Sequence, residues 1–145
     1  MGRTFRIALL AIAVAAAARA ADVLSAADVE KAAGVSGVKL VPRDPARGAG
    51  GDLNFSGPDG KLLVMVKVYK SGGYGSLKKT YFAADVPGVG DEAFAGPPGV
   101  KQPYVVYLRK RGGAASVTTY FDRGGKPKLS LAQLSDLGRI VASRM

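Results

Sequence analysis

The stretch YVVYLRKRGGAASVTTYF, residues 104–121, predicts the fold more directly than any other part of this 145-residue chain. On both sides of Gly112-Gly113, apolar residues alternate with other residues, which is typical of two β-strands joined by a two-residue turn. Pairing Leu108 with Val117 across that turn makes one face clearly more apolar than the other. A shift of one residue would mix the two faces. The sequence therefore predicts an antiparallel hairpin in this register.

A second hairpin is predicted upstream, where LNFS at residues 53–56 is followed by KLLVMVKVYK at residues 61–70. The sequence between them, G-P-D-G, is rich in turn formers. Pairing Phe55 with Leu62 places the apolar side chains of both segments on one face, as a consistent register requires.

Two helices are predicted because the same start signal occurs twice. Ser25 with Asp28 and Ser130 with Gln133 both fit a capping box, in which each side chain bonds the other residue's backbone N–H. Gly34 suits the left-handed position that ends a helix, so the first helix is short. The second helix is amphipathic, and its apolar stripe comprises Leu131, Leu134, Leu137 or Gly138, and Val141.

The order of these elements predicts an α+β fold. A further short helix is expected near residues 77–82, between the two hairpins. We expect an antiparallel sheet of about five to six strands, packed with the N-terminal short helix and the C-terminal amphipathic helix.

Three segments, together with the closing amphipathic helix, carry a resemblance to a known family. LSAADVEKAAG at residues 24–34, VPGVGDEAF at 86–94 and YVVYLRKRGG at 104–113 resemble small exported bacterial domains of uncharacterised function. They are similar to the PsbP-like α/β sandwich superfamily. The resemblance covers residues 21–145 and implies a fold, but no binding site, because the shared motifs form turns and caps. Many similar exported proteins carry a lipidated cysteine or a cysteine pair, whereas this chain has no cysteine, so no anchor is implied.

The N-terminus has the features of a secretory signal peptide. Two arginines precede an apolar run over residues 7–18, and A-R-A at residues 18–20 fits the A-x-A cleavage pattern. The run is shorter than the roughly 20 residues that a membrane-spanning helix needs. We therefore expect residues 1–20 to be removed and residues 21–145 to form one periplasmic or secreted domain that does not span the membrane.

The segment GVGDEAFAGPPGV, residues 88–100, fits the dinucleotide-binding pattern G-x-G-x-x-A. Such a loop must open a helix, but two consecutive prolines follow it, and Asp91 and Glu92 would place negative charge where a phosphate binds. We predict instead a turn at residues 88–90 and a short strand at 92–95, with Asp91 closing the turn and Glu92 solvated.

The composition argues against catalysis. The chain has no histidine and no cysteine, which removes the commonest general base, thiol nucleophiles and the usual zinc ligands. Asp91 and Glu92 are neighbours on a predicted strand and point to opposite faces, so they suit no glycosidase pair. GGYGSLKKT at residues 72–80 lacks the spacing of a phosphate-binding loop. We expect no enzyme activity, no catalytic residue, no metal and no cofactor.

Basic residues supply the candidate binding residues. Removing the three arginines of residues 1–20 lowers the formal net charge from +10 to +7. Arg109, Lys110 and Arg111 crowd one hairpin tip, while Lys126 and Lys128 flank a proline. Such clusters favour anionic surfaces. A solvated surface is the simpler interpretation of the same residues.

Three classes of function are therefore open. The first is an exported, non-catalytic binding module whose partner is an unknown envelope protein or a small ligand. The alternative is a basic protein that binds anionic envelope polymers or membrane surfaces, and the second alternative is an enzyme of unknown type. Exported proteins seldom meet nucleic acid inside the cell, so no nucleic-acid partner is expected.

Overall fold

The structure is a computed structural model that describes residues 23–42 and 52–145. The expected signal peptide, residues 1–20, lies outside the described residues. No helix within the described ranges is long and apolar enough to cross a membrane.

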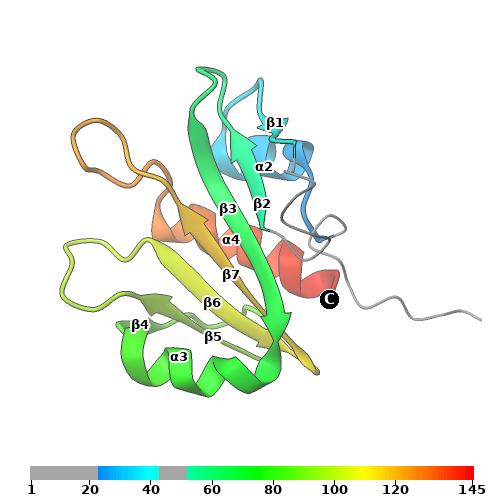
Figure 1. Ribbon diagram of the computed structural model, residues 1–145, viewed down its shortest axis with the longest axis vertical. Helices are drawn as coiled ribbons and strands as arrows, with labels where there is room; N and C mark the ends of the chain where they lie inside the picture. Colours follow the sequence, from blue (N-terminus) through cyan, green and yellow to red (C-terminus); the bar gives the residue numbers. More distant parts are fainter. Residues whose placement is uncertain (1–22, 43–51) are drawn as a thin grey trace, which may run out of the picture.

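One open antiparallel sheet organises the described part of the chain (Figure 1). Its seven strands lie in the order β1-β2-β3-β7-β6-β5-β4. Their bounds are Lys39–Leu40 for β1, Leu53–Ser56 for β2, Leu62–Lys70 for β3, Ala84–Asp85 for β4, Glu92–Gly96 for β5, Val105–Lys110 for β6 and Gly113–Thr119 for β7. The predicted count of five to six strands is too low, because β1 and β4 at the sheet edges have two residues each. Such short edge strands offer little backbone for pairing with another chain.

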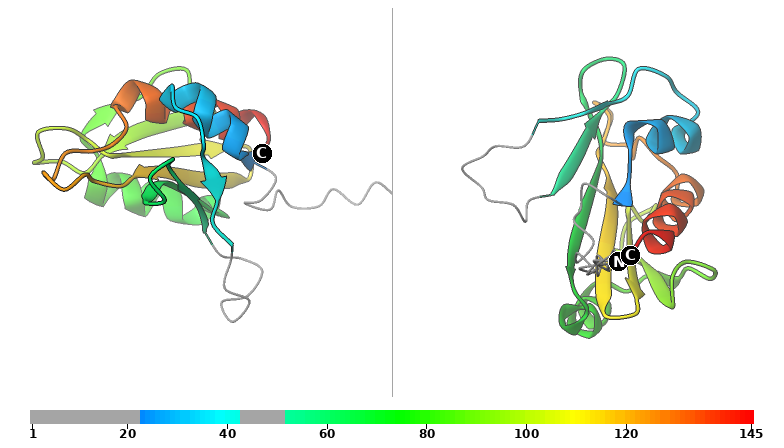
Figure 2. Two further views of the ribbon diagram at one scale, coloured as in Figure 1. Left: turned by 90° about the horizontal axis from the view of Figure 1, so that it is seen from above. Right: turned by 90° about the vertical axis from the view of Figure 1, so that its right-hand side faces the viewer.

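Three α-helices accompany the sheet in the described ranges, and the predicted α+β class is confirmed. They are α2 (Ala26–Ala33), α3 (Tyr74–Tyr81) and α4 (Leu131–Ser143), with a 3-10 turn η2 (Ser71–Gly73) directly before α3. Figure 2 shows α2 and α4 together on one face of the sheet and α3 on the opposite face. α3 begins three residues before the predicted range of 77–82.

Both predicted capping boxes are present. Ser25 accepts a bond from the N–H of Asp28, whose side chain accepts one from the N–H of Ser25, and Ser130 and Gln133 make the same reciprocal pair. Gly34 has the predicted left-handed conformation, with φ of 69°. These caps fix where α2 and α4 begin.

The main core lies between the sheet and the helices α2 and α4. Its largest fully buried side chains include Leu53, Phe55, Val64, Val66, Val106, Leu108, Leu134 and Leu137. A smaller second cluster lies under α3 and comprises the buried residues Tyr74, Phe94 and Ala114. Burial of this apolar surface is the main favourable term for a chain without disulfides.

The β6–β7 hairpin turns at Arg111 and Gly112, so the predicted turn at Gly112-Gly113 is wrong. Lys110 pairs with Gly113, which is the first residue of β7. Arg111 adopts a positive φ of 54°, which is uncommon for a residue other than glycine. Its backbone N–H donates to Oδ2 of Asp91 at 2.7 Å, and this bond holds the turn one residue earlier than the glycines suggest.

The strand pairing of this hairpin is correspondingly shifted. Leu108 lies opposite Ala115, and Val117 lies opposite Val106. The predicted pairing of Leu108 with Val117 is therefore wrong by two residues. Because side chains alternate with a period of two, the shift keeps every residue on its predicted face.

The β2–β3 hairpin shows the same kind of difference. Phe55 pairs with Val64, not with Leu62, and a register shift separates Phe55 from Ser56. Ser56 pairs with Leu62 instead. The bulge leaves Leu62 37% exposed, while Phe55 and Val64 are fully buried. Phe55 and Val64 still lie on one buried face, as predicted.

Candidate functional site

The structure separates the five predicted binding residues into two groups. Arg109, Lys110 and Arg111 lie at the turn between β6 and β7, which we call the hairpin tip, whereas Lys126 and Lys128 follow the far end of β7. Figure 1 shows these two places at opposite ends of that strand. β7 has seven residues, and at about 3.4 Å per residue it keeps the groups roughly 20 Å apart. They cannot form one compact site.

The hairpin tip carries its own counter-charge. Nε of Arg109 lies 3.0 Å from Oε2 of Glu92, and Lys78 pairs with the other oxygen of the same carboxylate. The hydrogen bond from Lys78 is the main reason why the pKa of Glu92 is lowered. The Arg109 guanidinium also lies 5.8 Å from the centre of the Tyr74 ring. The prediction that Glu92 is simply solvated is wrong, because it neutralises part of the tip.

The remaining tip cations do not converge. Arg109 and Lys110 are consecutive in β6, so their side chains leave opposite faces of the sheet. Arg111 is exposed at the turn itself, while Lys110 is half-buried. The tip therefore presents single charges in different directions rather than a cluster.

A better-formed site surrounds Lys126 and Lys128. Two adjoining hollows of about 480 Å³ and about 500 Å³ lie between the β2–β3 turn and the loop after β7. They share Asp59, Lys61, Asp122 and Lys128 in their linings, so we treat them as one surface. We call this surface the basic groove and define it by its four cations, Lys61, Arg123, Lys126 and Lys128.

Two similar turns present the groove lysines. In the first, the N–H of Lys61 donates to Oδ1 of Asp59 at 3.0 Å. In the second, the N–H of Lys126 donates to Oδ1 of Asp122 at 2.9 Å. A glycine with positive φ, 76° at Gly60 and 77° at Gly125, directly precedes each lysine. Each turn is therefore an aspartate-stabilised turn that ends in a lysine.

The two turns are joined by hydrogen bonds between segments that are distant in sequence. Nζ of Lys128 donates to the carbonyl oxygen of Leu62 at 2.7 Å. The N–H of Tyr120 donates to the carbonyl oxygen of Leu63 at 3.0 Å. These bonds place the loop after β7 against the β2–β3 turn.

The charge of the groove is unbalanced. Four cations and two aspartates line it, which leaves a formal charge of +2. The ion pairs found between described residues join Lys78 and Arg109 to Glu92, Arg139 to Asp136 and Arg144 to Asp28. None of these pairs uses a groove cation. The groove can therefore receive an anion without first breaking one of those ion pairs.

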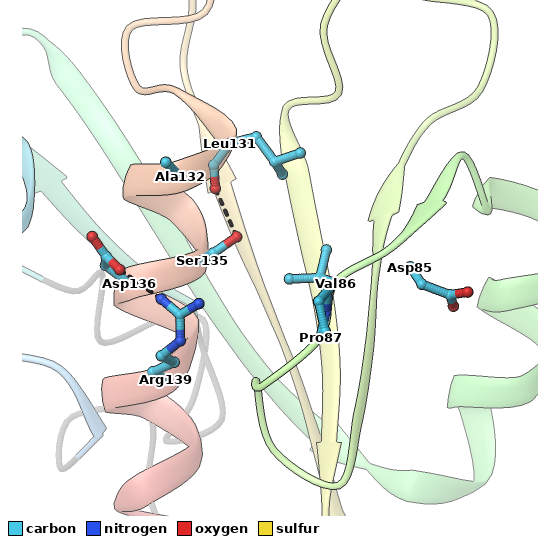
Figure 3. Close-up of a pocket in the computed structure, with 8 residues that line it drawn as sticks. All are labelled: Asp85, Val86, Pro87, Leu131, Ala132, Ser135, Asp136 and Arg139. Atoms are coloured by element: carbon cyan, nitrogen blue, oxygen red, sulfur yellow. Dashed lines mark hydrogen bonds and ion pairs between the residues drawn. The ribbon is translucent and has the colours of Figure 1, made fainter.

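A third hollow, of about 510 Å³, lies beside α4 (Figure 3). Its polar groups are already engaged: the Ser135 hydroxyl donates to the Leu131 carbonyl at 2.7 Å, and Asp136 pairs with Arg139 at 2.6 Å. Figure 3 shows the carboxylate of Asp85 pointing away from α4. This hollow offers fewer unused polar groups than the basic groove and is the weaker candidate.

Among the described residues, neither a metal cluster nor the most strongly shifted tyrosines lie at the basic groove. Within residues 23–42 and 52–145 no group of three His, Cys, Asp or Glu side chains could hold a metal ion. The strongest pKa effects on tyrosines come from burial, which raises the pKa of Tyr74 to about 12 and moves that of Tyr69 further upward. Both side chains belong to the cluster under α3, away from the groove.

Sequence reasoning missed Lys61 and Arg123 as groove residues. The sequence does contain one hint: residues 59–61 and residues 122–126 both begin with aspartate and end with Gly-Lys. The similarity predicts a shared site only if β3 pairs with β7, because that pairing brings the two turns together. No family model, curated protein or solved structure matches this chain. Its fold defines it as an α+β protein with an open antiparallel sheet, and the PsbP-like resemblance stays a prediction.

Proposed function

We propose that this chain is an exported, non-catalytic binding module that holds an anionic ligand in the basic groove. The observation that carries the proposal is the convergence of four cations from two turns on one surface, none of them in an ion pair with a described carboxylate. Of the two kinds of binding expected from the sequence, this geometry favours an anionic ligand. The site includes Lys126 and Lys128 but not the hairpin tip.

The location outside the cytoplasm is part of the proposal and rests on the N-terminal sequence. The protein recovered from the periplasm or medium should begin at Ala21, or within one or two residues of it. Intact-mass measurement of that material checks the cleavage. A mass that still includes Met1 to Ala20 would contradict export by this signal.

Retention on an immobilised polyanion, such as dextran sulfate, tests the binding surface. The groove variant replaces Lys61, Arg123 and Lys126 by glutamine and keeps Lys128, because Nζ of Lys128 bonds the Leu62 carbonyl. The matched tip variant replaces Arg109, Lys110 and Arg111 by glutamine. Both variants lose three positive charges, so a column that senses only net charge shifts them equally.

We expect the groove variant to elute at markedly lower salt than the tip variant. Exposed charge contacts are worth about 0–1 kcal/mol each, so three groove cations at the middle of that range give roughly a tenfold change in affinity. Retention of the native protein should fall steeply as salt shortens the screening length. Equal elution of the two variants would contradict a specific role for the groove.

A further inference from the structure

An exposed aromatic ring stands in the basic groove. Phe121 is 43% exposed and lines the same hollow as Lys61, Arg123 and Lys128. Its ring is held from one side by Tyr104, with ring centres 4.8 Å apart in an edge-to-face arrangement. Its backbone is fixed by the bridge to Pro127. Phe121 is therefore a positioned apolar surface in an otherwise polar loop, suited to a flat apolar face of a ligand.

The groove also offers unused hydrogen-bond acceptors. Asp59 and Asp122 accept bonds from backbone N–H groups through Oδ1: Asp59 from Lys61, and Asp122 from Gly124 and Lys126. No hydrogen bond from a described residue reaches Oδ2 of either aspartate. An ionised carboxylate has room for several donors. A ligand that carries both anionic groups and hydroxyl donors would satisfy the cations and these oxygens together.

We infer that the ligand is a segment of an acidic polysaccharide, with one sugar ring stacked on Phe121. This inference rests on the proposed function and names its ligand class. The C–H face of a sugar ring is apolar and covers the phenyl ring, its hydroxyls donate to Asp59 and Asp122, and its carboxylate pairs with the groove lysines. Inorganic polyphosphate has the charge but lacks both the apolar face and the hydroxyl donors.

The test uses a uronic-acid oligomer as the probe. Binding of oligogalacturonate to the native protein is measured by calorimetry and compared with binding of inorganic polyphosphate of equal charge. Phe121→Ala removes the ring, and Phe121→Trp restores an aromatic face. Phe82→Ala is the matched control, because Phe82 is also an exposed phenylalanine, 40% accessible, in the segment directly after α3.

We expect Phe121→Ala to weaken oligogalacturonate binding about tenfold, because covering about 50 Å² of apolar ring surface is worth that much at about 25 cal/mol per Å². Phe121→Trp should restore the affinity, and Phe82→Ala should leave it unchanged. Polyphosphate should bind more weakly and respond to neither substitution of Phe121. Unchanged thermal melting of the variants shows that each remains folded.

Three other outcomes would overturn either the saccharide inference or the proposed function. If polyphosphate binds as tightly as oligogalacturonate and Phe121→Ala affects neither, the groove binds anions but the saccharide inference is overturned. If Phe82→Ala weakens binding as much as Phe121→Ala, the ring of Phe121 has no specific role and the inference is overturned. If neither polymer binds, the proposed function itself fails.

Discussion

The side chain of Asp91 accepts a hydrogen bond from the backbone N–H of Arg111, at 2.7 Å, and so links the turn before β5 to the tip of the β6–β7 hairpin. The N–H of Asp91 in turn donates to the carbonyl oxygen of Arg109 at 2.9 Å. Asp91 therefore bonds both the N–H of Arg111 and the carbonyl oxygen of Arg109, at the point where β6 turns back into β7.

Replacing Asp91 by alanine should destabilise the protein by about 1 kcal/mol, the typical net value of one hydrogen bond. Asp91→Asn keeps an acceptor oxygen at this position and should retain most of the stability. Urea unfolding of the three proteins provides the measurement. If Asp91→Ala unfolds at the same urea concentration as the native protein, the bond does not hold the turn.

Gly90 is expected to tolerate no side chain. A Cβ at this position would lie 2.5 Å from the carbonyl oxygen of Arg109, and φ is +59°. Gly90→Ala should therefore destabilise the protein by about 2 kcal/mol or more, through strain and steric overlap. Gly88→Ala is the control, since φ is +78° but the nearest atom lies 4.0 Å away, and it should cost about 1 kcal/mol.

Thermal unfolding of these two glycine variants separates the effects of backbone conformation and crowding. Equal losses at the two positions would show that only the positive φ matters and that the close approach to Arg109 is relieved without cost.

The sequence was sufficient for features that depend on local chemistry. Ser25 and Ser130 begin α2 and α4 because a capping box needs only residues three positions apart. The buried faces of the strands were predictable for the same reason, since alternation along one strand is a local pattern.

Pairing partners depend on residues that are distant in sequence. Alternation fixes a face but allows shifts of two residues, and both hairpins show such a shift. In the β6–β7 hairpin, the hydrogen bond from Arg111 to Asp91, twenty residues earlier in the chain, favours the observed position of the turn. The basic groove escaped prediction for the same reason, because it exists only where the turn at Lys61 meets the loop of Lys126.

The ion pair between Asp28 and Arg144 should make the stability of the protein depend on pH. Arg144 donates to both carboxylate oxygens of Asp28, at 2.6 and 3.2 Å. This bond is the main cause that lowers the pKa of Asp28 from 3.8 to about 2. A lowered carboxyl pKa stabilises the folded state above pH 3.8, and that contribution is lost as pH falls toward 2.

Arg144→Gln should therefore reduce stability at pH 7, and the difference from the native protein should shrink between pH 4 and pH 2. Because the Arg144 side chain is 40% exposed, solvent screening limits the effect to about 1 kcal/mol. Arg139→Gln is the control, since the pair with Asp136 is more exposed on both sides, and it should change stability little. A pH-independent loss in Arg144→Gln would point to packing rather than charge.

The hydroxyl of Tyr74 is buried and has no hydrogen-bond partner among the described residues. Removing it as Tyr74→Phe should leave stability unchanged or raise it by about 1 kcal/mol, because an unpaired buried hydroxyl is costly. Tyr120→Phe is the control: it removes a bond of 2.6 Å to Oδ1 of Asn54 and should lower stability by about 1 kcal/mol. Chemical denaturation compares the two. A clear loss in Tyr74→Phe would mean that this hydroxyl is hydrogen-bonded in solution.

The basic groove, and not the hairpin tip, is the surface that we propose binds the anionic ligand. Backbone amide chemical shifts, recorded by NMR while oligogalacturonate is added, locate the contact directly. We expect the largest changes at residues 57–61 and 121–128, and small changes at Arg111 and Gly112. All of them should vanish at high salt. Changes centred on residues 109–113, or no changes at all, would contradict binding at the basic groove.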